Sequence, residues 1–182
     1  VLDERFDDAL RLVMLHRGEI LLESGQDARR PLVVRSRQGS MRALGTRFQV
    51  RQFDGSTRIG VSEGRVEVTP HDAHGPVLVV EAGREVTFTR SSISAAAPLP
   101  ATREAWTRGM LIADDLPLPD FLAELSRYRH GVLGCDPAIA RLRVVGAFPI
   151  HDTDEALAML EAALPVRARQ VLPWWVSVGP RK

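Results

Sequence analysis

Residues 39–50 read Gly-Ser-Met-Arg-Ala-Leu-Gly-Thr-Arg-Phe-Gln-Val, and residues 62–68 read Ser-Glu-Gly-Arg-Val-Glu-Val. In the first stretch, the apolar residues Phe48 and Val50 alternate with polar ones, which is the period of a strand with one buried face. Residues 57–61, which lie between the two stretches, alternate in the same way. Two pairs that supply the positive φ of tight hairpin turns separate the three runs: Asp54-Gly55 and Glu63-Gly64. The pattern therefore predicts a three-strand antiparallel meander.

The same kind of pattern fills the first half of the chain, where glycines separate short apolar runs without a helical period. The strand candidates are Leu10–Leu15, Glu19–Glu23, Pro31–Arg37, Arg47–Phe53, Thr57–Ser62, Arg65–Thr69, Val77–Glu81 and Glu85–Arg90. Many short strands at this spacing are typical of sheets that pack face to face or coil on themselves. We therefore expect residues 1–94 to form an all-β domain of stacked or coiled antiparallel strands.

A stretch of small residues and prolines, residues 95–102, interrupts this pattern and is expected to be a short linker. Beyond it the period changes. One apolar stripe has the i, i+3, i+4, i+7 spacing of a helix face: Leu118, Phe121, Leu122 and Leu125. A second stripe follows a capping box formed by Asp152 and Glu155: Leu157, Leu160 and Leu164. We expect both stripes to be core, although contact with a partner is an alternative for the first.

Strand candidates flank both helices: Met110–Ala113, Val132–Cys135, Leu142–Phe148 and Val166–Leu172, with Trp174–Val178 as a further candidate. The order predicts a small α/β domain, β-α-β-β-α-β, over residues 103–182, with two helices packed on one face of a small sheet.

The composition argues against several functions. The net charge is +1 and lysine occurs only at Lys182, so we expect no nucleic-acid partner and no phosphate-binding P-loop. Cys135 is the only cysteine, which excludes an internal disulfide. No apolar run approaches the roughly 20 residues of a membrane span, and we expect no direct membrane contact by this chain.

Two motifs could carry chemistry in the first half. Gly60-Val-Ser62-Glu-Gly64 matches the G-x-S-x-G nucleophile elbow of hydrolases, which needs a strand-to-helix turn. The residues on both sides keep a strand period, so we expect Ser62 in a hairpin turn instead. His71 and His74, beside Asp72, could bind a metal only if a fourth ligand converged on them, and we interpret this segment as a solvated loop.

The other candidates also favour structural roles. Asp114-Asp115 and the pair Asp152 and Asp154 precede the predicted helices, where carboxylates cap free N–H groups. Cys135 is interpreted as a small buried hydrophobe near a strand end. We therefore expect no enzyme, no metal site and no cofactor.

Two strand candidates alternate arginine with apolar residues, a pattern typical of a sheet edge. An open edge offers backbone hydrogen bonds to an added strand, and guanidinium groups attract an acidic partner. The candidate partner-binding residues are Arg141, Arg143, Val145, Arg167, Arg169 and Val171. The competing interpretation is an ordinary edge strand that its charges protect.

The chain also resembles a known family. The runs RALGTRFQVR (42–51), VSEGRVEV (61–68) and EAGREV (81–86) are similar to the periplasmic region of the FecR family of bacterial sigma-factor regulators. The resemblance continues from Trp106 through LRVVGAFP (142–149) to DTDEALAMLEAALP (152–165). The second domain resembles the STN module, a small signalling domain of secretins and TonB-dependent transporters.

The resemblance implies a fragment of a single-pass inner-membrane protein that lies in the periplasm. Members of the family carry a cytoplasmic anti-sigma segment, one membrane-spanning helix and usually several further strands ahead of the region matched here. The implied partners are the N-terminal signalling domain of an outer-membrane TonB-dependent transporter that carries a siderophore or ferric citrate, periplasmic and intramembrane proteases, and a sigma factor through the cytoplasmic segment. The implied result is release of an extracytoplasmic-function sigma factor for iron uptake. The alternative is a periplasmic ligand- or carbohydrate-binding β domain.

Overall fold

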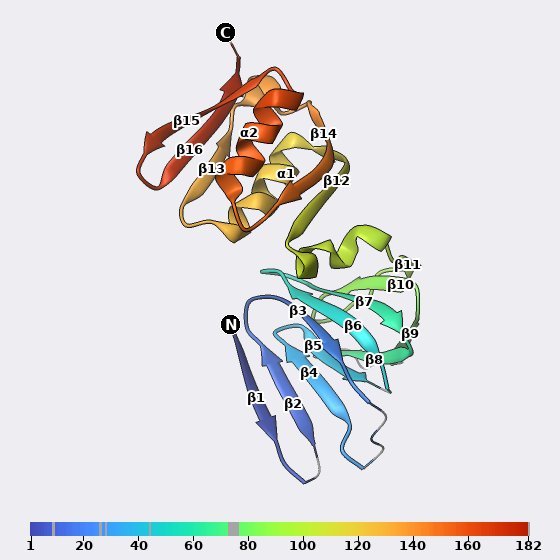
Figure 1. Ribbon diagram of the computed structural model, residues 1–182. Helices are drawn as coiled ribbons and strands as arrows, with labels where there is room; N and C mark the ends of the chain where they lie inside the picture. The colour runs from blue at the N-terminus through green and yellow to red at the C-terminus, as the bar shows by residue number, and fades with distance from the viewer. Residues whose placement is uncertain (9, 26, 28, 44, 73–76, 182) are drawn as a thin grey trace. The chain divides into compact units, whose positions relative to one another are not determined.

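The computed structural model describes residues 1–8, 10–25, 27, 29–43, 45–72 and 77–181. The chain divides into two compact units, Val1–Ala101 and Thr102–Lys182 (Figure 1). That residues 1–94 and 103–182 fold as two separate domains stays a prediction.

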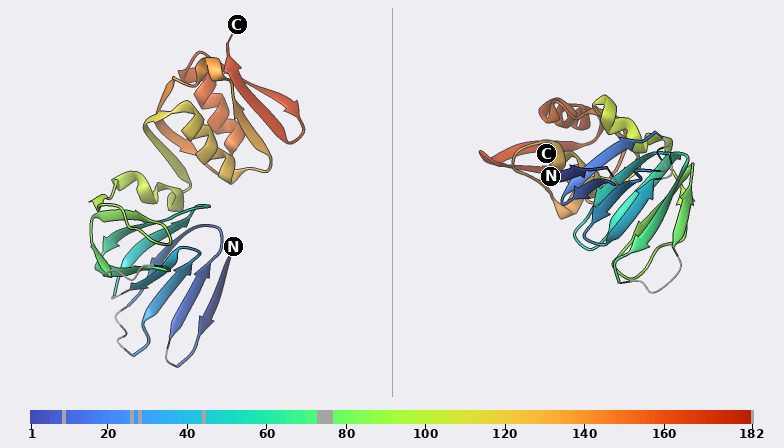
Figure 2. Two further views of the ribbon diagram at one scale, coloured as in Figure 1. Left: turned by 180° about the vertical axis from the view of Figure 1, so that it is seen from behind. Right: turned by 90° about the horizontal axis from the view of Figure 1, so that it is seen from below.

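The first unit is an all-β structure of two facing sheets, as expected (Figure 2). The six-stranded sheet has the order β1 (Leu2–Phe6), β2 (Arg11–Leu15), β4 (Leu32–Ser36), β5 (Gly39–Ala43), β8 (Arg65–Pro70) and β9 (Leu78–Glu81). The five-stranded sheet has the order β11 (Ala97–Pro98), β10 (Arg84–Phe88), β7 (Thr57–Glu63), β6 (Arg47–Gln52) and β3 (Gly18–Glu23).

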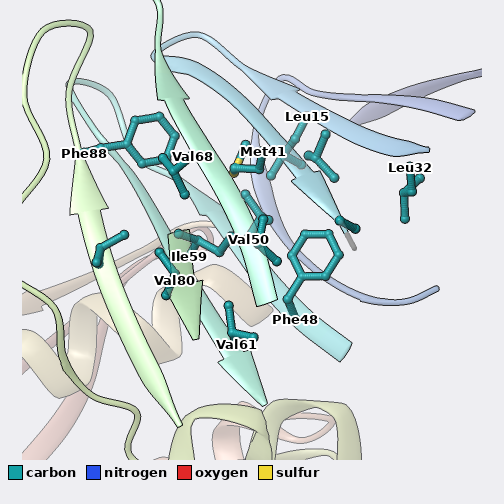
Figure 3. Close-up of a cluster of buried hydrophobic side chains, with 14 of the residues drawn as sticks. Leu15, Leu32, Met41, Phe48, Val50, Ile59, Val61, Val68, Val80 and Phe88 are labelled. Atoms are coloured by element: carbon teal, nitrogen blue, oxygen red, sulfur yellow. The ribbon is translucent and has the colours of Figure 1, made fainter. Parts of the chain in front are cut away.

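The core of the first unit lies between these sheets and consists mainly of aliphatic side chains (Figure 3). Phe48 and Val50 of β6 are fully buried and belong to the same cluster as Met41 of β5 and Val68 of β8. The alternation that predicted a strand at Phe48 and Val50 therefore has its expected physical cause, because these side chains point into a core shared by both sheets.

The chain crosses from one sheet to the other repeatedly, and a glycine in the left-handed region marks four of these crossings. They are Gly18 (φ 98°), Gly45 (φ 78°), Gly64 (φ 75°) and Gly83 (φ 77°). At Gly64, which alone separates β7 from β8, a Cβ would also collide with the backbone carbonyl oxygen of Gly45. Only glycine combines this φ with so close an approach of two backbone segments.

These crossings correct the predicted meander. Strands β6 and β7 form the expected antiparallel hairpin, but β8 pairs with β5 and β9 in the facing sheet. The positive φ expected at the Asp54-Gly55 turn is also wrong, since the left-handed glycines of the described chain do not include Gly55. Strands β2 and β4 are parallel because the strand between them, β3, belongs to the other sheet.

The segment expected as a linker is partly a strand. Residues Ala97–Pro98 form β11 against β10, and the Leu99 N–H donates to the Gly83 carbonyl oxygen at 2.9 Å. A proline is tolerated here because β11 is at the edge of its sheet. This segment therefore extends the five-stranded sheet of the first unit.

The second unit has the predicted order of elements, including the candidate final strand near Trp174–Val178. After a 3-10 segment (Ala101–Arg108) it runs β12 (Met110–Pro117), α1 (Leu118–Leu125), β13 (Val132–Cys135), β14 (Arg143–Pro149), α2 (Thr153–Ala163), β15 (Val166–Leu172) and β16 (Trp175–Pro180). Short 3-10 turns also occur at Ser126–Tyr128 and Pro137–Ile139. The likeness to an STN module stays a prediction.

The arrangement of these strands differs from the expected single sheet. Strands β12 and β14 form a two-stranded sheet, and β13, β16 and β15 form a separate three-stranded sheet. Both helices contact strands of both sheets, α1 through β12 and β13, and α2 through β14 and β15. The helices therefore do not lie on one face of one sheet.

The buried stripe of α1 confirms the core interpretation of Leu118, Phe121, Leu122 and Leu125, none of which is more than 1% exposed. The Phe121 ring packs on Phe148 of β14, with 4.6 Å between centroids. Helix α2 begins as predicted, since Asp152 Oδ1 accepts the Asp154 and Glu155 N–H groups at 3.1 and 2.9 Å.

Candidate functional site: the sheet edges of the second unit

The carboxylates ahead of α1 do not cap that helix. Asp114 and Asp115 lie inside β12, at a bulge between Ala113 and Leu116, and Pro117 occupies the N-cap position without a side-chain hydrogen bond. Asp115 has a φ of 51°, and its Oδ2 lies 3.3 Å from Nη2 of Arg143. The capping role predicted for this pair is therefore wrong, because the strand continues through both residues.

The described residues do not have the geometry of a hydrolase nucleophile elbow or of a metal site. Ser62 lies in β7 and is followed by β8 in the facing sheet, so the strand-to-helix elbow is absent there. Across the described residues, no group of three or more His, Cys, Asp and Glu side chains could hold a metal ion. His74 lies outside the described residues.

Asp72 instead forms an ion-pair cluster. Arg90 donates to both of its carboxylate oxygens, from Nε at 2.8 Å and from Nη2 at 3.0 Å, and His71 Nδ1 lies 2.7 Å from Oδ1. The hydrogen bonds from Arg90, and then from His71, lower the pKa of Asp72 to about 2. This arrangement holds His71 and Asp72, which follow β8, against Arg90, which follows β10.

Cys135 lies in β13, where it is partly buried against the core of the second unit. Burial, and to a smaller extent the charge of Asp136, raises the pKa of the Cys135 thiol. A raised pKa lowers the thiolate fraction, as expected for a small structural hydrophobe.

The first candidate partner edge is β14, whose hydrogen-bonded neighbour in its sheet is β12. Arg141 lies in the turn before the strand and makes no ion pair within the described residues. Arg143 begins the strand and pairs with Asp115, whereas Val145 is 70% exposed. Of the two arginines, Arg143 has a carboxylate beside it and Arg141 has none among the described residues.

The second candidate edge is β15, which lies at the border of the three-stranded sheet next to β16. Arg167 Nη1 lies 3.2 Å from Glu161 Oε2 of α2. Arg169 makes no ion pair among the residues that the structure describes, and Val171 is half exposed at a bulge near the end of the strand. The two sets of candidates belong to different sheets, with α2 packed against both strands, and so do not form one patch.

Glu161 is the residue at this edge that the sequence did not reveal. Its Oε1 accepts the Ala168 N–H at 2.7 Å, which is a backbone group that β15 directs away from β16. Its side chain is 18% exposed. The Glu161 carboxylate therefore occupies the position that a carbonyl oxygen of an added strand would take. It blocks strand addition at this point of the β15 edge. A hydrogen bond between residues of a helix and a following strand leaves no pattern in the sequence that could have predicted it.

A groove of about 470 Å³ lies between α2 and the β15–β16 hairpin. Its wall includes Glu161, Gln170 and Val176, together with Arg129 and Asp154. Arg129 Nη1 lies 3.0 Å from Asp154 Oδ1, while the buried Arg129 Nε has no hydrogen-bond partner among the described residues. The groove borders the backbone edge of β15, so side chains of an added strand could enter it.

No helix in the described part of the chain is both long enough and apolar enough to span a bilayer.

The comparisons with known proteins agree with the resemblance noted from the sequence. Residues 1–67 match the model of the FecR protein family, which confirms the resemblance over that part. Two crystal structures of a protein described as a putative anti-sigma factor from Parabacteroides distasonis share the fold, with TM-scores of 0.74 and 0.73 at 22% and 21% identity. Each alignment covers 97% of this chain and 83% of the other, and at this identity the likeness shows the fold alone. No curated protein matches the chain.

Proposed function

We propose that this chain is the periplasmic signalling region of a membrane-anchored, non-enzymatic sigma-factor regulator. Two findings support the class: residues 1–67 match the FecR family, and the fold is shared with a protein described as an anti-sigma factor over nearly the whole chain. In this proposal the second unit binds the signalling domain of an outer-membrane TonB-dependent transporter. Binding is then relayed, through proteolysis of the regulator, to an extracytoplasmic-function sigma factor that controls iron uptake.

The observation that carries the binding step is the open border of β15. The strand hydrogen-bonds to β16 on one side, and on the other side Glu161 satisfies the Ala168 N–H. An extended segment of the partner could add to this border by main-chain hydrogen bonds, with an acidic residue beside Arg169. The edge of β14, with Arg141, Arg143 and Val145, is a second place for such an addition. The first unit would hold the second in register or shield a cleavage site.

Titration calorimetry of the full chain with an isolated transporter signalling domain tests the proposal. We expect binding by the full chain, loss of binding after deletion of residues 103–182, and weaker binding by Arg169→Glu, because that change reverses the charge at the edge. Arg35→Glu, on the exposed surface of β4 in the first unit, is the matched charge control. Unchanged affinity after the deletion would show that the second unit is not the receptor of the signal.

A further inference from the structure

The outer face of the three-stranded sheet carries an exposed row of apolar side chains. Val176 and Val178 of β16 pack against the core, so Trp175 and Ser177 point to the opposite face. The strand register places Val132 of β13 and Leu172 of β15 on either side of Trp175. These three residues, here called the apolar row, are 50%, 41% and 37% exposed for Val132, Leu172 and Trp175.

The backbone around the apolar row holds it in place. Gly134 lies next to the Trp175 ring, where a Cβ would come within 3.1 Å of the indole Nε1. Trp174, in the turn between β15 and β16, is 58% exposed, and its carbonyl oxygen accepts the Val132 N–H at 2.8 Å. Gly131, with a φ of 101°, leaves room for that carbonyl. The two tryptophans are therefore presented on a hydrogen-bonded corner of the sheet, which lowers the ordering cost of binding.

Charges beside the apolar row are positive on the β15 side. The next row of the same face consists of Gly134, Ser177 and Arg169. Arg169 has no carboxylate partner in the described part of the chain, while Asp136 lies near Gly179 toward the opposite edge. An apolar centre with aromatic anchors and a polar rim is the anatomy of a protein interface. A carboxylate of the partner would form an ion pair with Arg169 in this rim.

We propose that the apolar row and Trp174 form the energetic centre of the partner interface, and that they insert into an apolar pocket bordered by acidic residues on a folded partner domain. This inference rests on the proposed function, since the row is continuous with the β15 edge. A protein fits better than an anionic lipid surface, because lipid attraction relies on a cluster of several basic residues. The corner offers only one arginine without an ion pair within the described residues.

The test is calorimetry of the full chain with the isolated signalling domain of a TonB-dependent transporter. Trp174→Ser and Arg169→Glu should each weaken binding, the first by about tenfold or more, as for a truncated aromatic anchor. Val79→Ser removes a similarly exposed apolar side chain (42%) from β9 of the first unit and should leave the affinity unchanged. Equal thermal unfolding of the variants and the wild type ensures that lost binding is not lost folding.

The possible outcomes separate this inference from the proposed function. If the Trp174→Ser variant binds the domain with the wild-type affinity, the inference is overturned and the proposed function stays intact. Absence of wild-type binding to the domain refutes the proposed function, and the inference with it. A third outcome is that the wild type does not bind the domain but co-sediments with phosphatidylglycerol vesicles, and that Trp174→Ser abolishes this co-sedimentation. That outcome would identify a lipid surface as the partner and would also overturn the inference.

Discussion

Replacing Phe121 by alanine should lower the stability of the second unit and leave that of the first unit unchanged. Phe121 is fully buried on α1, and its ring contacts Phe148 of β14. This contact joins the helix to the two-stranded sheet, and the neighbouring leucines of α1 belong to the same buried cluster. The substitution leaves a cavity at the centre of the second unit and removes no side chain from the first.

The magnitude follows from the burial and the ring contact. Truncating a buried phenylalanine costs about 3–5 kcal/mol, a range that includes the cavity left behind. A unit that spans Thr102–Lys182 is expected to have a free energy of unfolding of about 4–12 kcal/mol at typical stability per residue. With a urea m-value of about 1–2 kcal/mol/M, a loss of about 4 kcal/mol lowers the midpoint by about 2–4 M. At the lower end of that stability range, the second unit would then be close to unfolding without denaturant.

The chain provides its own reporter for this measurement. All three tryptophans, Trp106, Trp174 and Trp175, lie in the second unit, so their fluorescence follows that unit alone. Far-UV circular dichroism follows both units. We expect Phe121→Ala to shift the fluorescence transition and to leave a dichroism transition of the first unit near its wild-type midpoint.

Two control variants make this result interpretable. Met159→Ala changes a side chain of α2 that is 41% exposed and should shift neither transition by more than about 0.5 kcal/mol. Phe48→Ala, in the core of the first unit, should shift the dichroism transition and not the fluorescence. A fluorescence shift below about 1 kcal/mol in Phe121→Ala would refute the packing argument. In Phe121→Ala, a shift of the first unit's dichroism transition equal to that of the fluorescence would refute the expectation that residues 1–94 and 103–182 fold separately.

Four further predictions concern single residues. Gly64→Ala should destabilise the first unit by about 1–3 kcal/mol or more, because it places a side chain at positive φ against a backbone carbonyl, and the dichroism midpoint measures this. The pKa of Asp72 is lowered to about 2, so the carboxylate should stabilise the first unit above its ordinary pKa near 3.8, and this stability should be lost as the pH falls toward 2. Asp72→Asn should remove this pH dependence from the thermal midpoint of the first unit. A midpoint that depends on pH as steeply in the variant as in the wild type would contradict the prediction. Asp152→Ala should lower the stability of the second unit by about 0.5–2 kcal/mol through loss of the α2 cap, measured by fluorescence in urea. Glu161→Ala should strengthen binding of a transporter signalling domain in calorimetry, because it frees the Ala168 N–H for an added strand, and weaker binding would show that the carboxylate supports the interface instead of guarding it.

The sequence predicted the strands and their buried faces more reliably than it predicted their partners. The alternation around Phe48 and Val50 fixes which side chains are buried, and the structure buries both. It does not say whether β8 continues the sheet of β7 or joins the facing one, because the alternation marks the buried face of a strand and not its neighbours. In the observed sheet Val66 and Val68 are fully buried. The sheet that β8 joins depends on the close approach of Gly64 to Gly45. These two glycines are too far apart in the sequence for a local alternation to relate them.

The second unit shows the same limit. The stripes of α1 and α2 were predicted, since a 3.6-residue period is a local property. The separation into two small sheets was not, because β13 pairs with β16, and β14, α2 and β15 lie between these two strands in the sequence. At the candidate edges, sequence identified the arginines but not their carboxylate neighbours, Asp115 for Arg143 and Glu161 for Arg167.

The repeated passage of the chain between the two sheets of the first unit has a consequence for proteolysis. Because the chain repeatedly crosses between the layers, a single cut in a loop between β2 and β10 leaves two pieces that both contribute side chains to the same hydrophobic core. Such pieces separate only after many interlayer contacts break together, so a nicked chain should remain assembled until heat, denaturant or mechanical load pulls it apart. A regulator built this way could be cut first and released later, with the cut and the release as two separately timed events.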